Sequence, residues 1–312
     1  MSEPAYYIER LSASNLQHLC KLHFAVYGRA APARFFDKKY DTAFTGASNI
    51  GYIAFNNEGV AIGYYGVIPC FLMYEGKRVL SAQSADTMTH PGYRFKGLFV
   101  ELATITYALC RQEGINLVIG FPNQNSYHGA VNKLGWKMTD TMDCFTLPVS
   151  ALPIEKIAVK LKVSHIHSWV IGKMIRKLEW KRDEIGNMVV EQEGYAGICR
   201  DEEYMQYKTY NDNHVIRVGE SLVWLRIKNG LIIGDMRLAG GSFSSVIGQL
   251  KKLAAKLGCT RLQFHCSPGT RLHALFSERF AITPSFPVLF QDLDSGLQLE
   301  KFKFSFADID IF

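Results

Sequence analysis

Apolar positions change their spacing along residues 6–147, and these changes predict alternating strands and helices. Short continuous or alternating apolar runs indicate strands, whereas apolar residues three and four positions apart indicate one face of a helix. Leu98, Leu102, Ile105 and Leu109 follow the helical spacing, and Gly114 supplies a stop. The elements predicted here are strands at 6–10, 50–55, 59–69, 71–74, 79–88, 115–121 and 136–147, and helices at 15–27 (capped by Ser14 or Asn15), after Pro32, from Leu98 to Gly114, and from Asn125 or Ser126 to Leu134.

The second half of the chain shows a similar order of elements. Both halves run strand, glycine-containing turn, helix, glycine stop, strand, proline, helix, strand, and Arg237 and Gly240 repeat the spacing of Arg94 and Gly97. This order indicates a structural repeat, although any α/β segment shows some alternation. The elements predicted here are a helical basic segment at 154–182, strands at 189–191, 215–218, 222–227, 231–238, 261–266 and 287–293, and helices at 242–257 and 270–279.

Two prolines, Pro148 and Pro153, mark a boundary between the halves. The chain has 312 residues, which suits one large or two medium domains. We therefore predict an α/β (α+β) protein with a mixed sheet flanked by helices. The predicted domains are 1–147 and 189–312, with a helical linker or insertion at 148–188.

Composition narrows the classes of function. Hydrophobic residues make up 48% and charged residues 21%, which excludes global disorder. The net charge of +6 favours anionic small ligands and is too weak and scattered to indicate nucleic acid. No apolar run reaches the ~18 residues of a transmembrane helix, and residues 1–10 do not resemble a signal peptide.

The cysteines and histidines carry no metal-binding pattern. Seven cysteines occur without a CxxC pair, so we interpret them as reduced thiols of a cytoplasmic protein. His165 and His167 form a single HxH pair without neighbouring acidic or cysteine ligands. We expect no bound metal.

The turn from Thr89 to Phe99 is the strongest candidate for ligand binding. It follows a predicted strand and opens a predicted helix, and Arg94 and Gly97 stand three residues apart within it. Glycine allows close approach of the backbone, and the first N–H groups of a helix attract phosphate. The sequence therefore predicts that the N–H groups of Phe95 to Phe99 cradle a diphosphate, with Arg94 adding charge.

Other polar residues lie near this turn along the chain. Asp86 is the only acidic residue of the strand before it, and it is a candidate general base, an anchor for a cationic amine, or a structural acid bonded to Ser84 or Gln83. Polar residues also gather between the strand at 115–121 and the following helix, where capping and packing compete with substrate binding and proton donation: Asn123, Asn125, Ser126, Tyr127 and His128.

Three motifs in order resemble the GNAT superfamily of N-acetyltransferases. Thr87–Phe99 resembles the superfamily's acyl-CoA pyrophosphate turn, usually Arg/Gln-x-x-Gly-x-Gly/Ala. Gly120–Asn123 and Lys133–Trp136 follow at the superfamily's spacing. The resemblance covers roughly residues 6–147 and implies a mixed twisted sheet of the GNAT type. The second half resembles a degenerate GNAT-like module, which suggests a tandem arrangement without a second cofactor site.

The resemblance implies that acetyl-CoA, or another acyl-CoA, lies between the strand ending near Met88 and the strand ending near Phe121. Asp86, Tyr127 and His128 become the candidate catalytic residues. Two positions depart from the pattern: Phe99 replaces a small residue, and Val131 replaces a common tyrosine acid, for which Tyr127 is a substitute. The implied cofactor-binding residues are Met88, Thr89, His90, Arg94, Phe95, Lys96, Gly97, Leu98, Phe99, Asn123 and Ser126.

The implied activity is transfer of an acyl group from CoA to a primary amine. The run Gly120-Phe121-Pro122-Asn123 with Ser126-Tyr127 resembles GNAT proteins of surface-polysaccharide synthesis, so an amino sugar, nucleotide-linked or free, is the first expectation. Alternatives are an aminoglycoside- or peptide-directed acetyltransferase and a non-catalytic acyl-CoA sensor. The expected partner is a small-molecule amine, with no nucleic acid and no membrane insertion, and the oligomeric state is left open.

Overall fold

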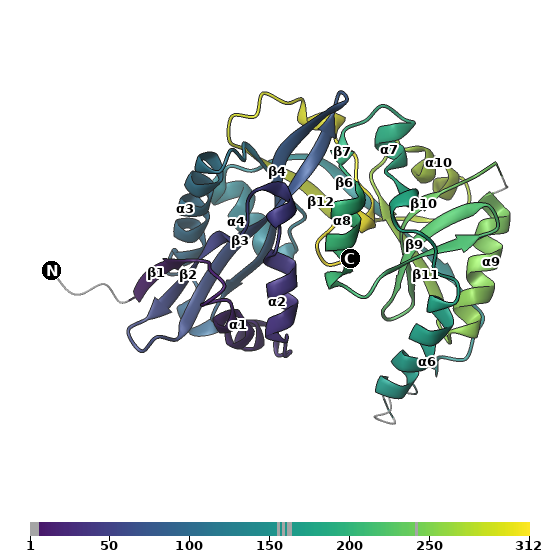
Figure 1. The fold of residues 1–312 in the computed structure, drawn as a ribbon, viewed down its shortest axis with the longest axis horizontal. Coiled ribbons are helices and arrows are strands. Elements are labelled where there is room, and N and C mark those ends of the chain that lie inside the picture. Colours follow the sequence, from purple (N-terminus) through teal and green to yellow (C-terminus); the bar gives the residue numbers. More distant parts are fainter. Residues whose placement is uncertain (1–5, 155–156, 158–159, 161–163, 241–242) are drawn as a thin grey trace. The chain divides into compact units, whose positions relative to one another are not determined.

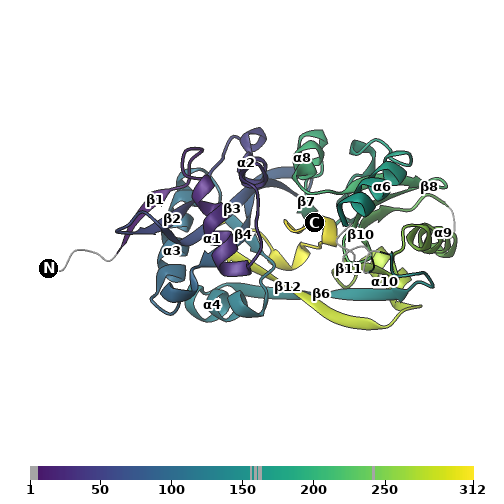
Figure 2. The same ribbon diagram turned by 90° about the horizontal axis from the view of Figure 1, so that it is seen from below.

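The computed structural model describes residues 6–154, 157, 160, 164–240 and 243–312 (Figures 1 and 2). The chain forms two compact units. The first unit contains Met1–Asp140 and Pro287–Glu300, and the second contains Thr141–Phe286 and Lys301–Phe312. Each unit is a mixed α/β structure, which confirms the predicted fold class.

The first unit is built on a sheet in the order β1-β2-β3-β4-β5-β12. All pairs are antiparallel except β4 with β5, which is parallel. Helix α3 contacts β2 and β3, whereas α1 contacts β3 and β4. The bounds are β1 Tyr6–Arg10, β2 Ile50–Asn56, β3 Ala61–Tyr74, β4 Lys77–Thr89, β5 Leu117–Gly120 and β12 Ile282–Asp292, with α1 Gln17–Tyr27, α2 Ala33–Tyr40, α3 Leu98–Gln112 and α4 Gln124–Leu134.

The apolar stripe of α3 lies in the core of this unit, as its spacing predicts. Leu98, Leu102 and Leu109 are buried in one cluster with residues of β2, β3 and β5. The sequence predicted two strands that separate after Pro69, but β3 is one continuous strand. Residues before and after Pro69 pair with β4. Asn15 also does not cap α1: its side chain accepts a hydrogen bond from the Ser12 N–H, and the helix begins at Gln17.

The second unit is built on a sheet in the order β6-β11-β10-β9-β8. Helix α9 contributes its buried face to a core with α6, α10 and the strands. Residues 189–191, predicted as a strand, lie in the short helix α7. The bounds are β6 Lys137–Pro148, β7 Gly197–Ile198, β8 His214–Val218, β9 Ser221–Ile227, β10 Leu231–Arg237 and β11 Arg261–Cys266, with α6 Ser164–Arg176, α7 Met188–Glu191, α8 Glu202–Tyr207, α9 Phe243–Lys256 and α10 Arg271–Ser277.

Each unit includes a strand segment from the other half of the sequence. Residues 141–148 of β6 lie in the second unit, where they pair with β11. Residues 287–292 of β12 lie in the first unit, where Leu289–Asp292 pair with β5. The sequence assigned 136–147 to the first domain and 287–293 to the second. A hydrophobic strand pattern does not specify which neighbour the strand pairs with, so this exchange was not visible in the sequence.

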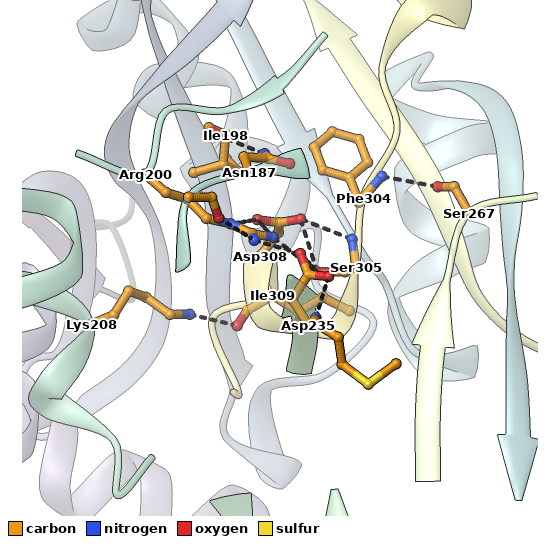
Figure 3. A network of polar contacts seen from close by, with 12 residues as sticks. Asn187, Ile198, Arg200, Lys208, Asp235, Ser267, Phe304, Ser305, Asp308 and Ile309 are labelled. Atoms are coloured by element: carbon orange, nitrogen blue, oxygen red, sulfur yellow. Dashed lines mark hydrogen bonds and ion pairs between the residues drawn. The ribbon is translucent and has the colours of Figure 1, made fainter. Parts of the chain in front are cut away.

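A fully buried ionic network joins the C-terminal segment of the second unit to β10 (Figure 3). The guanidinium of Arg200 lies 2.5 Å from Asp235 and 2.8 Å from Asp308. Ser305 accepts a further hydrogen bond from Arg200, and the Asp308 carboxylate caps the N–H of Ser305. An unpaired buried charge is costly, so the buried Arg200, Asp235 and Asp308 side chains are stabilised by pairing with one another and by hydrogen bonds to Ser305.

All seven cysteines are free. Five are buried, and Cys20 and Cys199 are partly exposed. Burial raises the pKa of the Cys110 thiol to about 12. No helix among the described residues is long and apolar enough to cross a membrane.

Candidate functional site

The turn between β4 and α3 has the geometry that phosphate binding requires. His90 follows the end of β4 and caps a short 3-10 turn at Pro91–Tyr93, and its side chain accepts a hydrogen bond from the N–H of Gly92. Phe95 and Gly97 then take left-handed backbone conformations, with φ of 64° and 83°. Such residues turn successive N–H groups toward one side of a loop.

The N–H groups of this turn are available to a ligand. Gly97 precedes α3, and no side chain caps the helix. Within the described part of the chain, no hydrogen bond uses the N–H groups of Phe95 to Phe99. Arg94 and Lys96 are both exposed beside them, and Lys96 lies 4.8 Å from the centre of the Tyr93 ring. Free amides at a helix start with two cations fit a diphosphate.

Phe99, at the position where a small residue is usual, has a matching gap on the neighbouring helix. A Cβ added to Gly129 of α4 would lie 2.7 Å from the Phe99 ring. The ring also packs edge-on against Tyr65, at 5.9 Å between centroids. The large side chain is therefore accommodated by the absence of a side chain at Gly129.

Strands β4 and β5 separate next to the turn. In the described structure they pair only at Ala82 with Val118 and at Gln83 with Ile119. Beyond these pairs β4 continues to Thr89, whereas β5 ends at Gly120. The separation leaves backbone groups of β4 without strand partners on that side, and an extended ligand can hydrogen-bond to such an edge.

Asp86 lies at a β-bulge close to this separation. The register between β3 and β4 shifts between Tyr64 and Gly66, so that Asp86 and Thr87 together oppose one residue. Asp86 has φ of 49°, which is rare for a residue with a side chain. The bulge turns the carboxylate toward helix α2, where it contacts Lys39 and Tyr40.

The Asp86 carboxylate belongs to a buried polar cluster. Its Oδ2 atom lies 2.7 Å from Lys39 Nζ and accepts a hydrogen bond of 2.9 Å from the Tyr40 hydroxyl. The side chain of Lys39 is 2% exposed and that of Asp86 is 16% exposed. Burial and then the Asp86 charge raise the pKa of Tyr40, and burial also raises that of Tyr64, whose ring packs edge-on against Tyr40. Tyr40 and Tyr64 therefore stay protonated beside this carboxylate.

The sequence did not single out Lys39 or Tyr40 as site residues. Lys39 is buried in the last turn of α2, and a buried lysine needs an anionic partner. Asp86, the acidic residue of β4, is that partner. The signal in the sequence was the apolar spacing of Phe36 and Tyr40, which places Lys39 next to the buried face of α2.

The residues at the start of α4 have different roles from one another. Asn123 is the cap, and its side chain accepts hydrogen bonds from the N–H groups of Asn125 and Ser126. The cap predicted at Asn125 or Ser126 is therefore wrong by two or three residues. His128 is exposed and bonds to Asn132 at 2.7 Å. These contacts favour a structural role for Asn123 and leave His128 accessible.

Tyr127 packs against the core on the α3 side of the sheet, together with Val131. Its hydroxyl donates a weak hydrogen bond of 3.4 Å to the sulfur of Met138. No contact among the described residues joins Asp86 with Tyr127 or His128. The structure therefore does not bring the three candidate catalytic residues into one hydrogen-bonded group.

A buried chain of hydroxyl groups lies beneath the turn. Trp136 donates its indole N–H to Tyr107 at 2.9 Å, the Tyr107 and Tyr65 hydroxyls are 2.9 Å apart, and Tyr65 reaches Ser84 at 3.1 Å. Burial raises the pKa of Tyr65 to about 12. A Cβ at Gly120 would lie 2.6 Å from the Trp136 ring, so glycine is required where β5 ends. The chain fixes β4 and α3 relative to each other.

The sequence of the first unit resembles a known family of proteins. Residues 7–139 match the family model described as an acetyltransferase (GNAT) domain. This part of the chain, which is less than half of its 312 residues, is similar to GNAT acetyltransferase domains. The turn of Arg94–Phe99, with its free amides, and the separated strands β4 and β5 lie within the matched part and form the candidate ligand site of this unit. A search of curated protein sequences found no match.

Solved structures with a similar fold extend over both units. A probable N-acyltransferase, described as a conserved protein of unknown function, from Enterococcus faecalis V583 aligns with 96% of this chain and 75% of its own, at 12% identity and a TM-score of 0.64. GCN5-related N-acetyltransferases from Kribbella flavida and Anabaena variabilis align with 93% of this chain and 72% and 73% of theirs, at 12% and 13% identity and TM-scores of 0.56 and 0.55. At these identities the likeness concerns the fold.

Proposed function

We propose that the protein transfers an acetyl or other acyl group from CoA to a primary amine. The observation that supports this proposal is the turn at the start of α3, where N–H groups without a hydrogen bond lie beside two exposed cations, Arg94 and Lys96. The match of residues 7–139 to an acetyltransferase domain supports it. CoA supplies the acyl thioester, and the chain binds, orients and desolvates the reactants.

The residues of the turn and of β4 would position the donor. Arg94, Lys96 and the N–H groups of Phe95 to Phe99 would bind the diphosphate, and the β4 backbone at Met88–His90 would bind the pantetheine arm. The amine nitrogen then forms a bond to the thioester carbon, the carbon–sulfur bond breaks, and the amine loses a proton while the thiolate gains one.

Asp86 is proposed to attract the amine. Protonation of its carboxylate would leave the Lys39 ammonium without this counter-charge in a buried position, which opposes a role as the proton acceptor. An anionic oxygen at the bulge can instead hold a cationic or polarised amine beside β4. This favours the anchoring role over that of the general base.

The proton donor to the departing thiolate is proposed to be Tyr127 or His128. Val131 occupies the position where many members of the superfamily have tyrosine. Tyr127 lies one helical turn earlier, and its hydroxyl makes only a weak bond to Met138 sulfur. His128 is exposed. The rates of acyl transfer by Tyr127→Phe and by His128→Gln, measured separately, distinguish the two candidates.

The second unit is proposed to be a degenerate module without a cofactor. β10 has a bulge between Ile233 and Asp235, and Asp235 pairs with the buried Arg200, just as β4 has a bulge at Asp86, which pairs with the buried Lys39. The C-terminal residue Phe312 lies where a Cβ on Gly234 would be, at 2.2 Å. These features support the proposal that, in the second unit, the Phe312 ring occupies the space that corresponds to the acceptor site of the first unit.

The acceptor is proposed to be an amino sugar, free or nucleotide-linked, in the cytoplasm. This choice follows the resemblance of Gly120–Asn123 and the residues after it to GNAT proteins of polysaccharide synthesis. An aminoglycoside or peptide amine is the alternative within the same chemistry. An acyl-CoA sensor without turnover is the alternative of another class, and it is retained because Val131 replaces the common tyrosine acid.

Thiol release from acetyl-CoA, measured with a panel of amines, tests the proposal. We expect release with an amino-sugar acceptor, and a loss of at least ~10-fold in kcat/KM for Arg94→Ala. Arg111→Ala, an exposed arginine at the other end of α3, is the matched control and should keep full activity. Tight binding of acetyl-CoA without release by any amine would favour the sensor and contradict the enzyme.

A further inference from the structure

The chain of hydroxyl groups beneath the turn has a single arrangement of hydrogens that pairs every buried donor. The indole N–H of Trp136 can only donate, so the Tyr107 oxygen accepts its hydrogen bond of 2.9 Å. The Tyr107 hydroxyl must then donate to Tyr65, 2.9 Å away, and the Tyr65 hydroxyl must donate to Ser84, 3.1 Å away. Either opposite direction would leave a tyrosine O–H buried without an acceptor, which is costly.

This direction leaves the hydrogen of the Ser84 hydroxyl at the end of the chain. Among the described residues, the Ser84 side chain makes no hydrogen bond other than the one with Tyr65. Tyr65, Tyr107 and Trp136 are buried, whereas Ser84 is partly exposed. Hydrogen bonds in a row polarise one another, so the groups behind Ser84 strengthen its O–H as a donor. The chain therefore presents an oriented donor to whatever lies beside Ser84.

Ser84 lies at the point where β4 and β5 begin to separate. It directly follows Gln83, the last residue of β4 that pairs with β5. The proposed function places the pantetheine arm along this separation and the diphosphate at the turn. Ser84 precedes the end of β4 at Thr89 by five residues, which is ~16 Å at ~3.3 Å per residue. This distance is comparable with the length of an extended pantetheine arm, so the acyl end of the donor would lie near Ser84.

Ser84 and Asp86 serve opposite faces of the sheet. Tyr64 and Tyr65 are neighbours on β3, so their side chains point to opposite faces. Tyr64 packs against Tyr40 of α2, whereas Tyr65 lies in the core that α3 covers. Asp86 bonds to Tyr40, and Ser84 bonds to Tyr65. An acyl group between the separated strands would therefore have a carboxylate on one side and a hydroxyl donor on the other.

We propose that the Ser84 O–H donates a hydrogen bond to the carbonyl oxygen of the acyl thioester and is a catalytic residue of the transfer. This inference rests on the function proposed above. When the amine nitrogen bonds to the thioester carbon, the π electrons of the carbonyl move onto its oxygen, and a donor already aimed at that oxygen stabilises the charge. When the carbon–sulfur bond breaks, the carbonyl forms again and the thiolate leaves. Ser84 keeps its proton throughout.

Infrared spectra of acetyl-CoA, isotope-labelled at its carbonyl carbon, test this hydrogen bond without an acceptor amine. We expect the carbonyl band of the bound thioester at a lower wavenumber in the wild-type protein than in Ser84→Ala, because a hydrogen bond to the oxygen weakens the C=O bond. Ser84→Thr keeps the hydroxyl and should keep the shift. The matched control is Ser81→Ala on the same strand, whose buried hydroxyl has no partner in the described structure; the band should not move.

Two further measurements separate this role from a structural one. Tyr65→Phe keeps Ser84 but removes the hydroxyl that orients it, so the carbonyl band should lie between those of the wild-type protein and Ser84→Ala. With the amine of the panel that supports thiol release, Ser84→Ala should lower kcat by ~10²-fold and change the KM for acetyl-CoA little. Circular dichroism and calorimetric binding of acetyl-CoA show that each variant is folded and holds the donor.

The possible failures distinguish this inference from the proposed function. The same carbonyl wavenumber in the wild-type protein and in Ser84→Ala, both with bound acetyl-CoA, would overturn the inference alone. An equal shift caused by Ser81→Ala would do the same. If Ser84→Ala does not fold, an unchanged band in Tyr65→Phe would overturn it instead. Failure of acetyl-CoA to bind to the wild-type protein would contradict the proposed function, and this inference with it.

Discussion

The ion pair between Lys39 and Asp86 allows a direct test of how the site is held. At 2.7 Å and an effective dielectric constant of about 20, two unit charges attract by ~6 kcal/mol. Desolvation of the two groups offsets most of this gain, but removal of one partner leaves the other charged and buried, which costs ~3–5 kcal/mol. We expect Asp86→Asn to destabilise the protein by about 3–4 kcal/mol because Lys39 is only 2% exposed.

The reciprocal change should cost less. Lys39→Met leaves Asp86 16% exposed to water and still bonded to the Tyr40 hydroxyl, so the expected loss is about 1–2 kcal/mol. The double variant should resemble Lys39→Met alone, because the uncompensated ammonium is absent. The cycle therefore predicts a coupling energy of about 3–4 kcal/mol from urea unfolding, equal to the cost of Asp86→Asn alone.

A surface pair of the same unit serves as the control. Arg10 and Glu113 are 2.8 Å apart, close to the 2.7 Å of the buried pair, but their side chains are 48% and 31% exposed. The cycle of Arg10→Met and Glu113→Gln should give a coupling of no more than ~0.5 kcal/mol. Equal coupling energies in the two cycles would refute the argument that burial makes the Lys39–Asp86 pair matter.

Further predictions concern packing, titration and the second unit. Gly129→Ala should destabilise the protein by about 1–2 kcal/mol in thermal unfolding, despite the better helix propensity of alanine, because its Cβ would meet Phe99; adding Phe99→Ala should remove the clash, and no recovery would contradict it. Burial lowers the pKa of His265 to about 4, below its unfolded value, so its contribution to stability is complete above pH 6.5 and falls by about 2 kcal/mol at pH 5. His265→Gln should flatten the stability profile between pH 8 and 5, and an unchanged profile would oppose this. Arg200→Met should cost about 3–5 kcal/mol because it leaves Asp235 and Asp308 buried without their cation; a change below ~1 kcal/mol in urea unfolding would contradict that.

The sequence predicted most of the first unit because its local signals agree with its fold. The helical spacing of Leu98 to Leu109 and the glycine at 97 directly encode α3 and its start. It could not predict the contacts of Asp86, since Lys39 is far from it in the sequence and only the bulge of β4 turns the carboxylate toward α2.

The sequence also could not predict how the strands are shared between the units. A run such as 287–293 has the apolar pattern of a buried strand wherever it pairs, and only the assembled sheet shows that Leu289–Asp292 pair with β5. The cap of α4 was misplaced for a local reason: Asn123, Asn125 and Ser126 are all good caps, and the preceding Pro122 does not decide among them.

The measurement that tests the central claim most directly is calorimetric binding of acetyl-CoA and of S-acetylpantetheine, which lacks the diphosphate, to the wild-type protein and to Arg94→Ala. If the turn from Arg94 to Phe99 binds the diphosphate, acetyl-CoA should bind at least ~10-fold more tightly than S-acetylpantetheine, and Arg94→Ala should weaken only acetyl-CoA. Equal affinities for the two ligands, or an equal effect of Arg94→Ala on both, would contradict the assignment of the acyl-CoA site.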